Sequence, residues 1–101
     1  MFKLILQACG NVDHEENPYE NIVNGKIVQE NHIICNSIKE CQKATRNYIE
    51  QNNLGSGNFL GGFTFDEYDN QVGYISYNAK YWKKGSKYYI KFGFYKRVII
   101  C

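Results

Sequence analysis

Only one stretch of the chain has the pattern of a helix, and this feature constrains the fold most. Ser37 is followed three residues later by Glu40, a capping box in which the Ser37 hydroxyl accepts from the Glu40 amide and the Glu40 carboxylate reaches back. Apolar and small side chains then recur at spacings of three and four residues, at Ile38, Cys41, Ala44, Thr45, Tyr48 and Ile49. This predicts an amphipathic helix over residues 38–52, ended by a left-handed Asn53 with Leu54 folded back on the last turn.

Runs of strand-forming residues surround this helix. Residues 2–8 and 26–35 precede it, separated by a long polar loop over residues 9–25. Four runs follow the helix, at residues 58–67, 71–80, 81–84 and 87–94, and residues 98–101 extend the last one. The order β-β-α-β-β-β-β predicts an α+β fold, an antiparallel sheet of five to six strands with one main helix packed on one face. Without repeats or a linker, residues 1–101 form a single α+β domain.

A glycine-rich segment, LGSGNFLGG, follows the predicted helix. Phosphate-binding loops open a helix, where unpaired N–H groups and the positive end of the dipole face the ligand, whereas this segment follows a helix end. Gly55 and Gly57 are typical of a corner between helix and strand. Gly61 and Gly62 indicate a β-bulge or a close backbone approach, and they leave room for something flat, such as a base or a neighbouring backbone.

Charge is divided unevenly along the chain. Residues 1–78 hold five cations and all ten acids, a sum of −5, and residues 79–101 hold seven cations and no acid, a sum of +7. Such asymmetry predicts that the C-terminal segment faces an anion. The alternative is a solubilising edge whose cations pair with the acidic part of the same chain.

Little in the sequence indicates catalysis, a metal or a cofactor. His14 and His32 lack a recognisable catalytic setting, and His32 with Cys35 and Cys41 offers three soft ligands in an awkward geometry without a fourth. We therefore expect a protein that is not an enzyme and has no metal site and no cofactor. The first residues are too short for a signal peptide, nothing approaches a membrane span, and the cysteines are expected to be buried in a reducing cytoplasm.

The C-terminal third interleaves aromatic and cationic residues. Tyr and Trp side chains stack on flat rings, and Lys and Arg neutralise phosphate, so this pattern predicts a nucleotide-like ligand or single-stranded nucleic acid. In a strand over residues 87–94, Tyr88, Ile90, Phe92 and Phe94 share the core face and the lysines the wet face. The alternative is a sheet with one wet face on which lysines are ordinary.

The segment GSGNFLGGFTFDEYDNQVGYISYNAKYW gives the chain a resemblance to a known family. Its GG strand and its ISYN element followed by Lys and Trp resemble the first type of Thoeris anti-defence sponge, a family of small phage proteins. The resemblance covers residues 37–82. It implies a non-catalytic oligomer in the host bacterial cytoplasm that captures a cyclic ADP-ribose isomer, so that this immune signal no longer reaches its effector.

The resemblance also implies ligand-binding residues. Asn78 matches the Asn of the ISYN element and is expected to bind base or ribose, and Tyr77, Lys80 and Trp82 belong to the same element. Lys80 stands where the family pattern has Arg, which weakens bidentate contact with phosphate and puts its role in doubt. Two further residues are expected in the site: Tyr68, stacking from a hairpin tip, and Arg97, reaching a phosphate.

Other functions and an assembly state are predicted beside this one. The charge division favours a phage inhibitor of a host nucleoprotein, anti-CRISPR-like, that acts by protein binding, and the aromatic and basic residues favour a small RNA- or single-stranded-DNA-binding domain. One helix covers one face of the sheet, so aromatic side chains on the other face are expected to be exposed and to drive a homodimer or higher oligomer. A loop over residues 10–25 that covers this face is the alternative.

Overall fold

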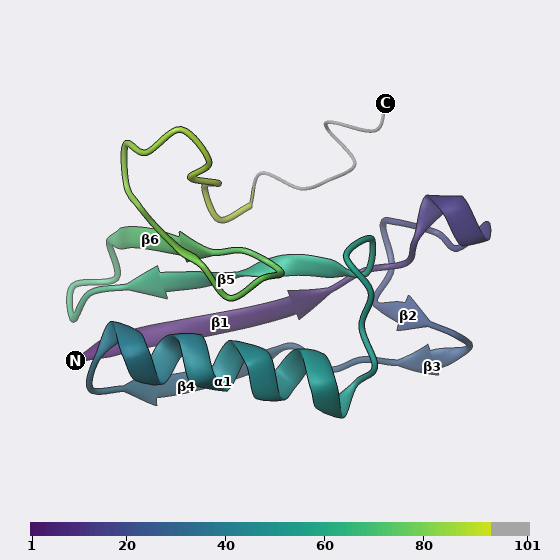
Figure 1. The fold of residues 1–101 in the computed structure, drawn as a ribbon, viewed down its shortest axis with the longest axis horizontal. Helices are drawn as coiled ribbons and strands as arrows, with labels where there is room; N and C mark the ends of the chain where they lie inside the picture. Colours follow the sequence, from purple (N-terminus) through teal and green to yellow (C-terminus); the bar gives the residue numbers. More distant parts are fainter. Residues whose placement is uncertain (94–101) are drawn as a thin grey trace.

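The structure is a computed structural model and describes residues 1–93. One antiparallel sheet has the strand order β4-β1-β5-β6-β7, formed by β1 (Phe2–Ala8), β4 (Asn31–Cys35), β5 (Phe59–Phe65), β6 (Gln71–Ile75) and β7 (Tyr81–Lys83). A single helix, α1 (Ile38–Gln51), packs on one face (Figure 1). Between β1 and β4 lie the short helix η1 (Val12–His14) and a small hairpin of β2 (Ile22–Val23) and β3 (Lys26–Ile27). The predicted α+β fold with one helix on an antiparallel sheet is confirmed.

The helix begins and ends as its sequence predicts. The Ser37 side chain accepts a hydrogen bond from the Glu40 amide at 3.2 Å, and the Glu40 carboxylate accepts from the Asn36 amide, one residue earlier than a capping box places it. At the other end Asn53 is left-handed, with φ of 50°, and the Leu54 amide donates to the Ile49 carbonyl at 3.0 Å.

The main core lies between α1 and the sheet. Cys41 and Tyr48 of the helix are buried against Leu4 and Leu6 of β1 and Ile75 of β6. Gly62 lets the helix approach closely, because a Cβ atom there would lie 3.2 Å from the Thr45 hydroxyl. The helix therefore buries the apolar side chains on this face of the sheet.

The opposite face of the sheet, here called the back face, is covered by the chain after β7. Ile5, Phe63 and Tyr74 are buried there, and the Phe92 ring lies edge-on to Phe63 at 5.2 Å. The side chain of Gln71 fixes this segment, because its Nε2 donates to the Ile90 carbonyl at 2.8 Å and its Oε1 accepts from the Phe92 amide at 2.6 Å.

This cover corrects three predictions. Residues 87–93 form turns and irregular chain, so the predicted strand over 87–94 is wrong within the described residues, and its extension over 98–101 lies outside them. The buried back face removes the argument that exposed aromatic residues there drive dimerisation. The segment after β7, and not the predicted loop over residues 10–25, packs on Phe63, while η1 and the β2–β3 hairpin lie at one end of the sheet (Figure 1). Association into a dimer stays a prediction.

Two predicted strands are shorter than expected. Residues 26–35 divide into β3 and β4, because Asn21 binds both backbone groups of Val28. The Val28 amide donates to the Asn21 carbonyl at 2.8 Å, and the Asn21 side chain donates to the Val28 carbonyl at 2.9 Å. Residues 71–80 divide into β6 and a tight turn over residues 76–80. The ISYN element therefore lies mainly in a turn.

Gly61 and Gly62 of β5 were predicted to mark a β-bulge and to leave room for a flat group. The register between β1 and β5 shifts at Leu60, beside Gly61, so the predicted bulge is confirmed. A Cβ atom on Gly61 would lie 2.3 Å from Cε1 of Tyr74, and the φ of Gly61 is 148°. The flat group over this glycine is thus the ring of Tyr74 from the same chain, and no ligand is needed to fill the space.

The polar segment between β1 and β4 is organised by one carboxylate. Glu16 accepts from the Asn11 amide at 3.0 Å, from the Asn24 amide at 2.6 Å and from the side chain of buried Asn58 at 3.2 Å. Asn58 also donates to the Cys9 carbonyl at 3.1 Å, which joins the segment to the corner after α1. These hydrogen bonds, first those from Asn11 and Asn24, lower the pKa of Glu16.

Acidification is expected to release this segment before the core unfolds. Because the pKa of Glu16 is lowered in the folded state, its stabilising effect is present above the ordinary glutamate pKa of 4.5 and is lost as the pH falls through the lower folded pKa. Glu16→Gln should reproduce the release at neutral pH, seen by NMR as faster hydrogen exchange of the Asn11 and Asn24 amides. Glu15→Gln is the matched control, and equal exchange in both variants would contradict this role of Glu16.

Candidate functional site

An aromatic hollow of about 620 Å³ lies where the turn over residues 76–80, β7 and the segment after it meet. Its lining holds five aromatic rings, one lysine, one isoleucine and two polar side chains of the turn: Tyr74, Ser76, Tyr77, Asn78, Trp82, Lys87, Tyr88, Tyr89 and Ile90. Three of the six predicted site residues, Tyr77, Asn78 and Trp82, are among them. The sequence thus identified one side of the hollow, and the segment over 87–90 supplies the other.

The turn that carries Asn78 is held rigidly. The Ala79 amide donates to the Ser76 carbonyl at 2.8 Å, and the Ser76 amide donates to the Lys80 carbonyl at 3.1 Å. Ala79 is left-handed, with φ of 64°, a conformation that is unfavourable for a residue with a Cβ atom. Its methyl group is buried in the main core, and its carbonyl accepts from Gln42 of α1 at 3.1 Å. Contacts with α1 and the main core therefore fix the position of the turn.

A short relay of hydrogen bonds fixes the orientation of Trp82. The indole Nε1 donates to the Ser76 hydroxyl at 3.2 Å, and the hydroxyl lies 2.5 Å from Oδ1 of Asn78. The Lys80 amide donates to the same Oδ1 at 3.2 Å. The acceptor oxygen of Asn78 is thus used inside the turn, and its Nδ2 makes no hydrogen bond to any described residue.

Aromatic rings and ammonium groups alternate around the rim. Trp82 and Tyr88 lie edge to face with centroids 4.8 Å apart, the Lys80 ammonium lies 4.8 Å from the Trp82 ring, and the Lys87 ammonium lies 5.4 Å from the Tyr88 ring. Tyr88 is 55% exposed, so it presents ring surface at the rim. Burial raises the pKa of Tyr74 to about 12, and burial together with Tyr81 raises the pKa of Tyr89, so both phenols remain protonated at neutral pH.

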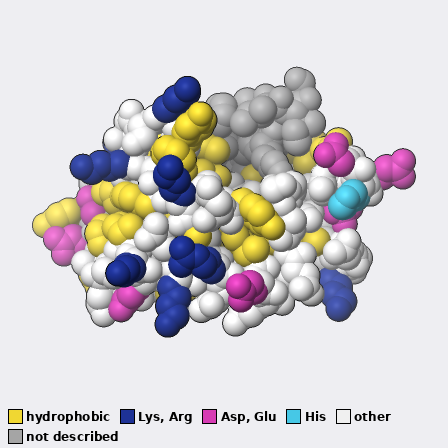
Figure 2. Space-filling view, in the orientation of Figure 1, with side chains coloured by type: hydrophobic (Ala, Val, Ile, Leu, Met, Phe, Trp, Pro, Cys, Tyr) yellow, Lys and Arg dark blue, Asp and Glu magenta, His cyan; other side chains and the backbone are white. Residues whose placement is uncertain are grey.

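The lysines around the hollow are not neutralised by the described chain. Within residues 1–93 the ion pairs are Lys3 with Asp69 and His32 with Glu30, and neither involves Lys80, Lys83, Lys84, Lys87 or Lys91. The alternative in which these lysines pair with the acidic part is therefore wrong for residues 1–93. Figure 2 shows acidic side chains and a histidine at the end of the molecule with η1 and the β2–β3 hairpin, whereas most Lys and Arg side chains lie toward the other end, with further acidic side chains among them. Lys80 and Lys87 thus bring unneutralised positive charge to the rim of the hollow.

Three predicted site residues do not line the hollow among the described residues. Tyr68 is 76% exposed in the turn between β5 and β6, at the end of β6 opposite the ISYN turn, so its assignment to the site stays a prediction that the hollow does not support. Arg97 lies outside the described residues. Lys80 lies on Trp82 at the rim without lining the hollow.

Six lining residues were not among the predicted site residues: Tyr74, Ser76, Lys87, Tyr88, Tyr89 and Ile90. Ser76 stood inside the quoted ISYN element, and its hydroxyl, two residues before Asn78 in a turn, was a signal that could have been used. Tyr88 was assigned to a core face because residues 87–94 were expected to form a strand.

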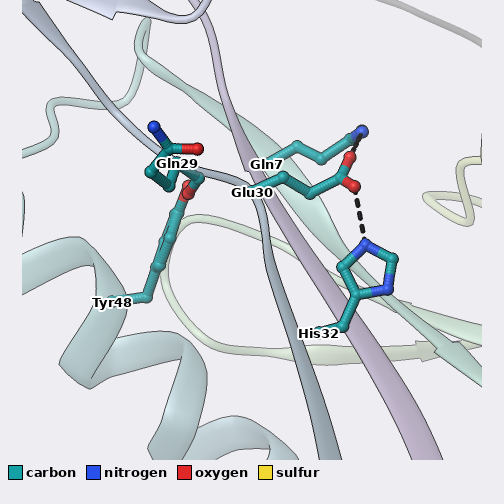
Figure 3. Close-up of polar contacts among 5 residues, drawn as sticks. All are labelled: Gln7, Gln29, Glu30, His32 and Tyr48. Carbon is teal, nitrogen blue, oxygen red and sulfur yellow. Dashed lines mark hydrogen bonds and ion pairs between the residues drawn. The ribbon is translucent and has the colours of Figure 1, made fainter.

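A second polar cluster joins β4 to β1 and α1 (Figure 3). His32 Nε2 lies 2.6 Å from Glu30 Oε2, Gln7 donates to the other oxygen of Glu30, and the Tyr48 hydroxyl donates to the Gln29 carbonyl at 2.8 Å. The hydrogen bond from His32 is the main cause that lowers the pKa of Glu30. Gln7 and Glu30 also line a pocket of about 270 Å³ beside Pro18 and Tyr19. These contacts link neighbouring elements and bring no nucleophile to the histidine.

Residues 1–93 contain three buried cysteines, Cys9, Cys35 and Cys41, and the prediction that they are buried is confirmed. Burial raises the pKa of Cys41 to about 12, with a further contribution from Cys35. His32 bonds to Glu30 instead of joining the two cysteines. No group of three or more His, Cys, Asp or Glu that could hold a metal ion occurs in this part of the chain, and none of its helices is long and apolar enough to cross a membrane.

Comparison with known proteins returned no match: no family model, no curated protein and no solved structure matches this chain. The resemblance to the sponge family therefore stays a prediction, and the argument for function depends on the geometry of the hollow.

Proposed function

We propose that the chain binds a nucleotide-derived anion in the aromatic hollow and holds it without chemical turnover. The observation that carries the proposal is the meeting of five aromatic rings with lysines that form no ion pair among residues 1–93. Aromatic rings stack on a base, and ammonium groups neutralise a phosphate. A ligand with both features uses both parts of the site.

The absence of turnover is supported by the side chains of the hollow. Its described lining contains no Asp, Glu, His or Cys, and the hydroxyl of Ser76, a potential nucleophile, has no general base beside it and is engaged by Trp82 and Asn78. The relay from Trp82 to Asn78 and the core-anchored Ala79 instead give a preformed surface, which favours tight binding because little ordering is needed when the ligand arrives.

The sponge resemblance narrows the proposed ligand to a cyclic ADP-ribose isomer. In this form the protein acts in the host bacterial cytoplasm, removes the signal by binding it, and assembles into an oligomer. The lysine at position 80 is the departure from the family pattern, and as a point charge it contributes less to phosphate orientation than Arg does.

The sole tryptophan makes the proposal directly testable, because Trp82 lines the hollow. Titration with cyclic ADP-ribose isomers and with ADP-ribose should change its fluorescence emission with a Kd below about 10 μM, roughly −7 kcal/mol, and denaturation should release the ligand unchanged. Calorimetry gives the same Kd independently. Binding without any change in Trp82 emission would place the ligand elsewhere, and no binding by either method would contradict the proposal.

A small RNA- or single-stranded-DNA-binding domain is a second candidate, favoured by the unpaired lysines over residues 80–91. Affinity for an oligonucleotide that spans several lysines should fall steeply with salt, since each neutralised phosphate releases counterions. A mononucleotide engages fewer charges and should respond weakly. The salt slope therefore separates the two candidates.

A further inference from the structure

We infer that Gln71 is a positioning residue of the aromatic hollow, on which ligand affinity depends although Gln71 does not line the hollow itself. The inference rests on the proposed function and deepens it, because it names the side chain that holds one side of the site in place. The observation that carries it is Ile90, which lines the hollow and whose carbonyl accepts a hydrogen bond from Gln71.

Residues 87–90, here called the wall, form one side of the hollow. They follow the last strand of the described chain and belong to no strand themselves, so no ladder of backbone hydrogen bonds ties them to the sheet. Among the described residues, the two hydrogen bonds that join residues 87–93 to the sheet both involve Gln71, the first residue of β6. The wall therefore depends on one side chain for its polar contacts with the sheet.

The amide group of Gln71 takes the place of a neighbouring strand. Its Nε2 donates to the Ile90 carbonyl at 2.8 Å and to the Gly73 carbonyl at 3.1 Å, and its Oε1 accepts from the Phe92 amide at 2.6 Å. A side-chain amide both donates and accepts, as a peptide group does, so it fixes the position of the wall along β6. The packing of Phe92 on Phe63 adds apolar contact, which is not directional.

The chain on either side of the wall does not restrain it in the same way. Gly85 and Gly93 have φ of 92° and 87°, and a Cβ atom on either would meet no atom within 4 Å. The opposite side of the hollow has its own support, because β7 pairs with β6 and Trp82 donates to Ser76. Loss of the Gln71 hydrogen bonds should therefore displace the wall alone, and affinity should fall in proportion to the fraction of molecules with the wall in place.

Gln71→Glu tests the inference, because its two protonation states differ in what they can hold. The ionised carboxylate can still accept from the Phe92 amide, but it cannot donate and it repels the carbonyls of Ile90 and Gly73. Affinity for ADP-ribose and the cyclic ADP-ribose isomers should be about 10-fold below wild type at neutral pH, as expected when roughly one molecule in ten has the wall in place.

Acidification should restore the affinity of Gln71→Glu. The protonated carboxyl has a donor for Ile90 and an acceptor for Phe92, so the wall in place favours the protonated form. Since this form becomes populated as the pH falls, affinity should rise toward wild type as the pH is lowered to about 5, near the ordinary glutamate pKa of about 4.3. Dividing by the wild-type affinity at each pH removes titration of the ligand and of other groups.

Gln71→Met is the matched control, because it has a similar length and makes no hydrogen bond. It should lose affinity at both pH values without recovery. The wall is also followed without ligand, through NMR cross-peaks between the rings of Trp82 and Tyr88, whose centroids lie 4.8 Å apart. These cross-peaks should weaken in Gln71→Glu at neutral pH and return at about pH 5.

The outcomes separate this inference from the proposed function. Binding by wild type that both variants retain, or a loss in Gln71→Glu that acidification does not reverse, would overturn the inference and leave the proposed function intact. Unchanged ring cross-peaks in Gln71→Glu at neutral pH would also overturn the inference. If wild type bound none of these ligands, the proposed function would fail and the inference with it.

Discussion

Replacing Trp82 with alanine is expected to weaken binding of the nucleotide ligand by about 10- to 100-fold, the range for loss of one base-stacking aromatic ring. The change removes the ring between the Lys80 ammonium and Tyr88, and it removes the N–H that holds the Ser76 hydroxyl toward Asn78. Since Trp82 is only half-buried on the edge strand β7, the free energy of unfolding should fall by about 1 kcal/mol, the scale of one cross-strand contact. Calorimetry measures the affinity and urea unfolding the stability.

Two control variants separate stacking from orientation. Trp82→Phe keeps an aromatic ring without the N–H donor, so it should retain much of the affinity and lose only the part that depends on the hydrogen bond to Ser76. Tyr68→Ala removes a ring that is 76% exposed and lies away from the hollow, so its affinity should equal that of wild type. If Tyr68→Ala weakened binding as much as Trp82→Ala, the hollow would not be the binding site.

Replacing Phe63 with alanine is expected to cost about 3 to 5 kcal/mol of the free energy of unfolding, the range for truncating a buried aromatic side chain. Phe63 is 2% exposed, and its ring lies 5.5 Å from Tyr74 and 5.2 Å from Phe92. These contacts hold the segment that supplies Lys87, Tyr88 and Tyr89 to the hollow. For a domain of this size such a loss is a large part of the total stability, and urea unfolding should show it.

A graded control makes this prediction specific. Phe63→Leu keeps most of the apolar volume and should cost less than half as much as Phe63→Ala. Phe65→Ala removes a half-buried ring that also contacts Phe92, at 5.5 Å, and should have an intermediate effect. A cost below about 1 kcal/mol for Phe63→Ala would show that the back face is not packed as described, since a buried phenylalanine normally contributes several times more.

The helix and the fold class could be predicted from the sequence because their signals are local. The Ser37 cap, the spacing of Cys41 and Tyr48, and the left-handed Asn53 all concern neighbours within a few residues, and the structure has each of them. The runs of strand-forming residues at 2–8 and 59–65 likewise indicate strands directly.

The errors arose where distant contacts decide the backbone. Residues 87–93 have a strand-like composition, but Gln71 takes the hydrogen bonds of Ile90 and Phe92, and Phe92 packs on Phe63, so the segment crosses the back face instead of extending the sheet. Residues 26–35 were divided by Asn21 in the same way. Gln71 lies 19 residues before Ile90 and Asn21 lies seven residues before Val28, so local patterns show neither contact, and propensity yields to such contacts.

The site was half predictable for the same reason. Asn78 and Trp82 belong to one turn and one strand, so a local element brings them together. Tyr88 joins them only because the chain turns after β7. Tyr68 was included among the predicted site residues because residue spacing along a hairpin does not show which end of a strand faces the ligand. The loss of the acceptor on Asn78 follows from two hydrogen bonds that no sequence pattern displays.

The ring of Tyr74 has a consequence for how such a site can evolve. The ring fills the space over Gly61, packs on Phe63 and also forms one wall of the hollow. Residues at the rim, such as Tyr88, can be substituted singly without disturbing the core, so a single mutation there can change which ligand is bound. Position 74 offers no such step: a smaller residue leaves a gap over a glycine, and any residue larger than glycine at 61 collides with the ring until it has been shortened. Divergence among descendants of this chain should therefore accumulate at the rim, while Gly61 and Tyr74 are inherited together as a pair.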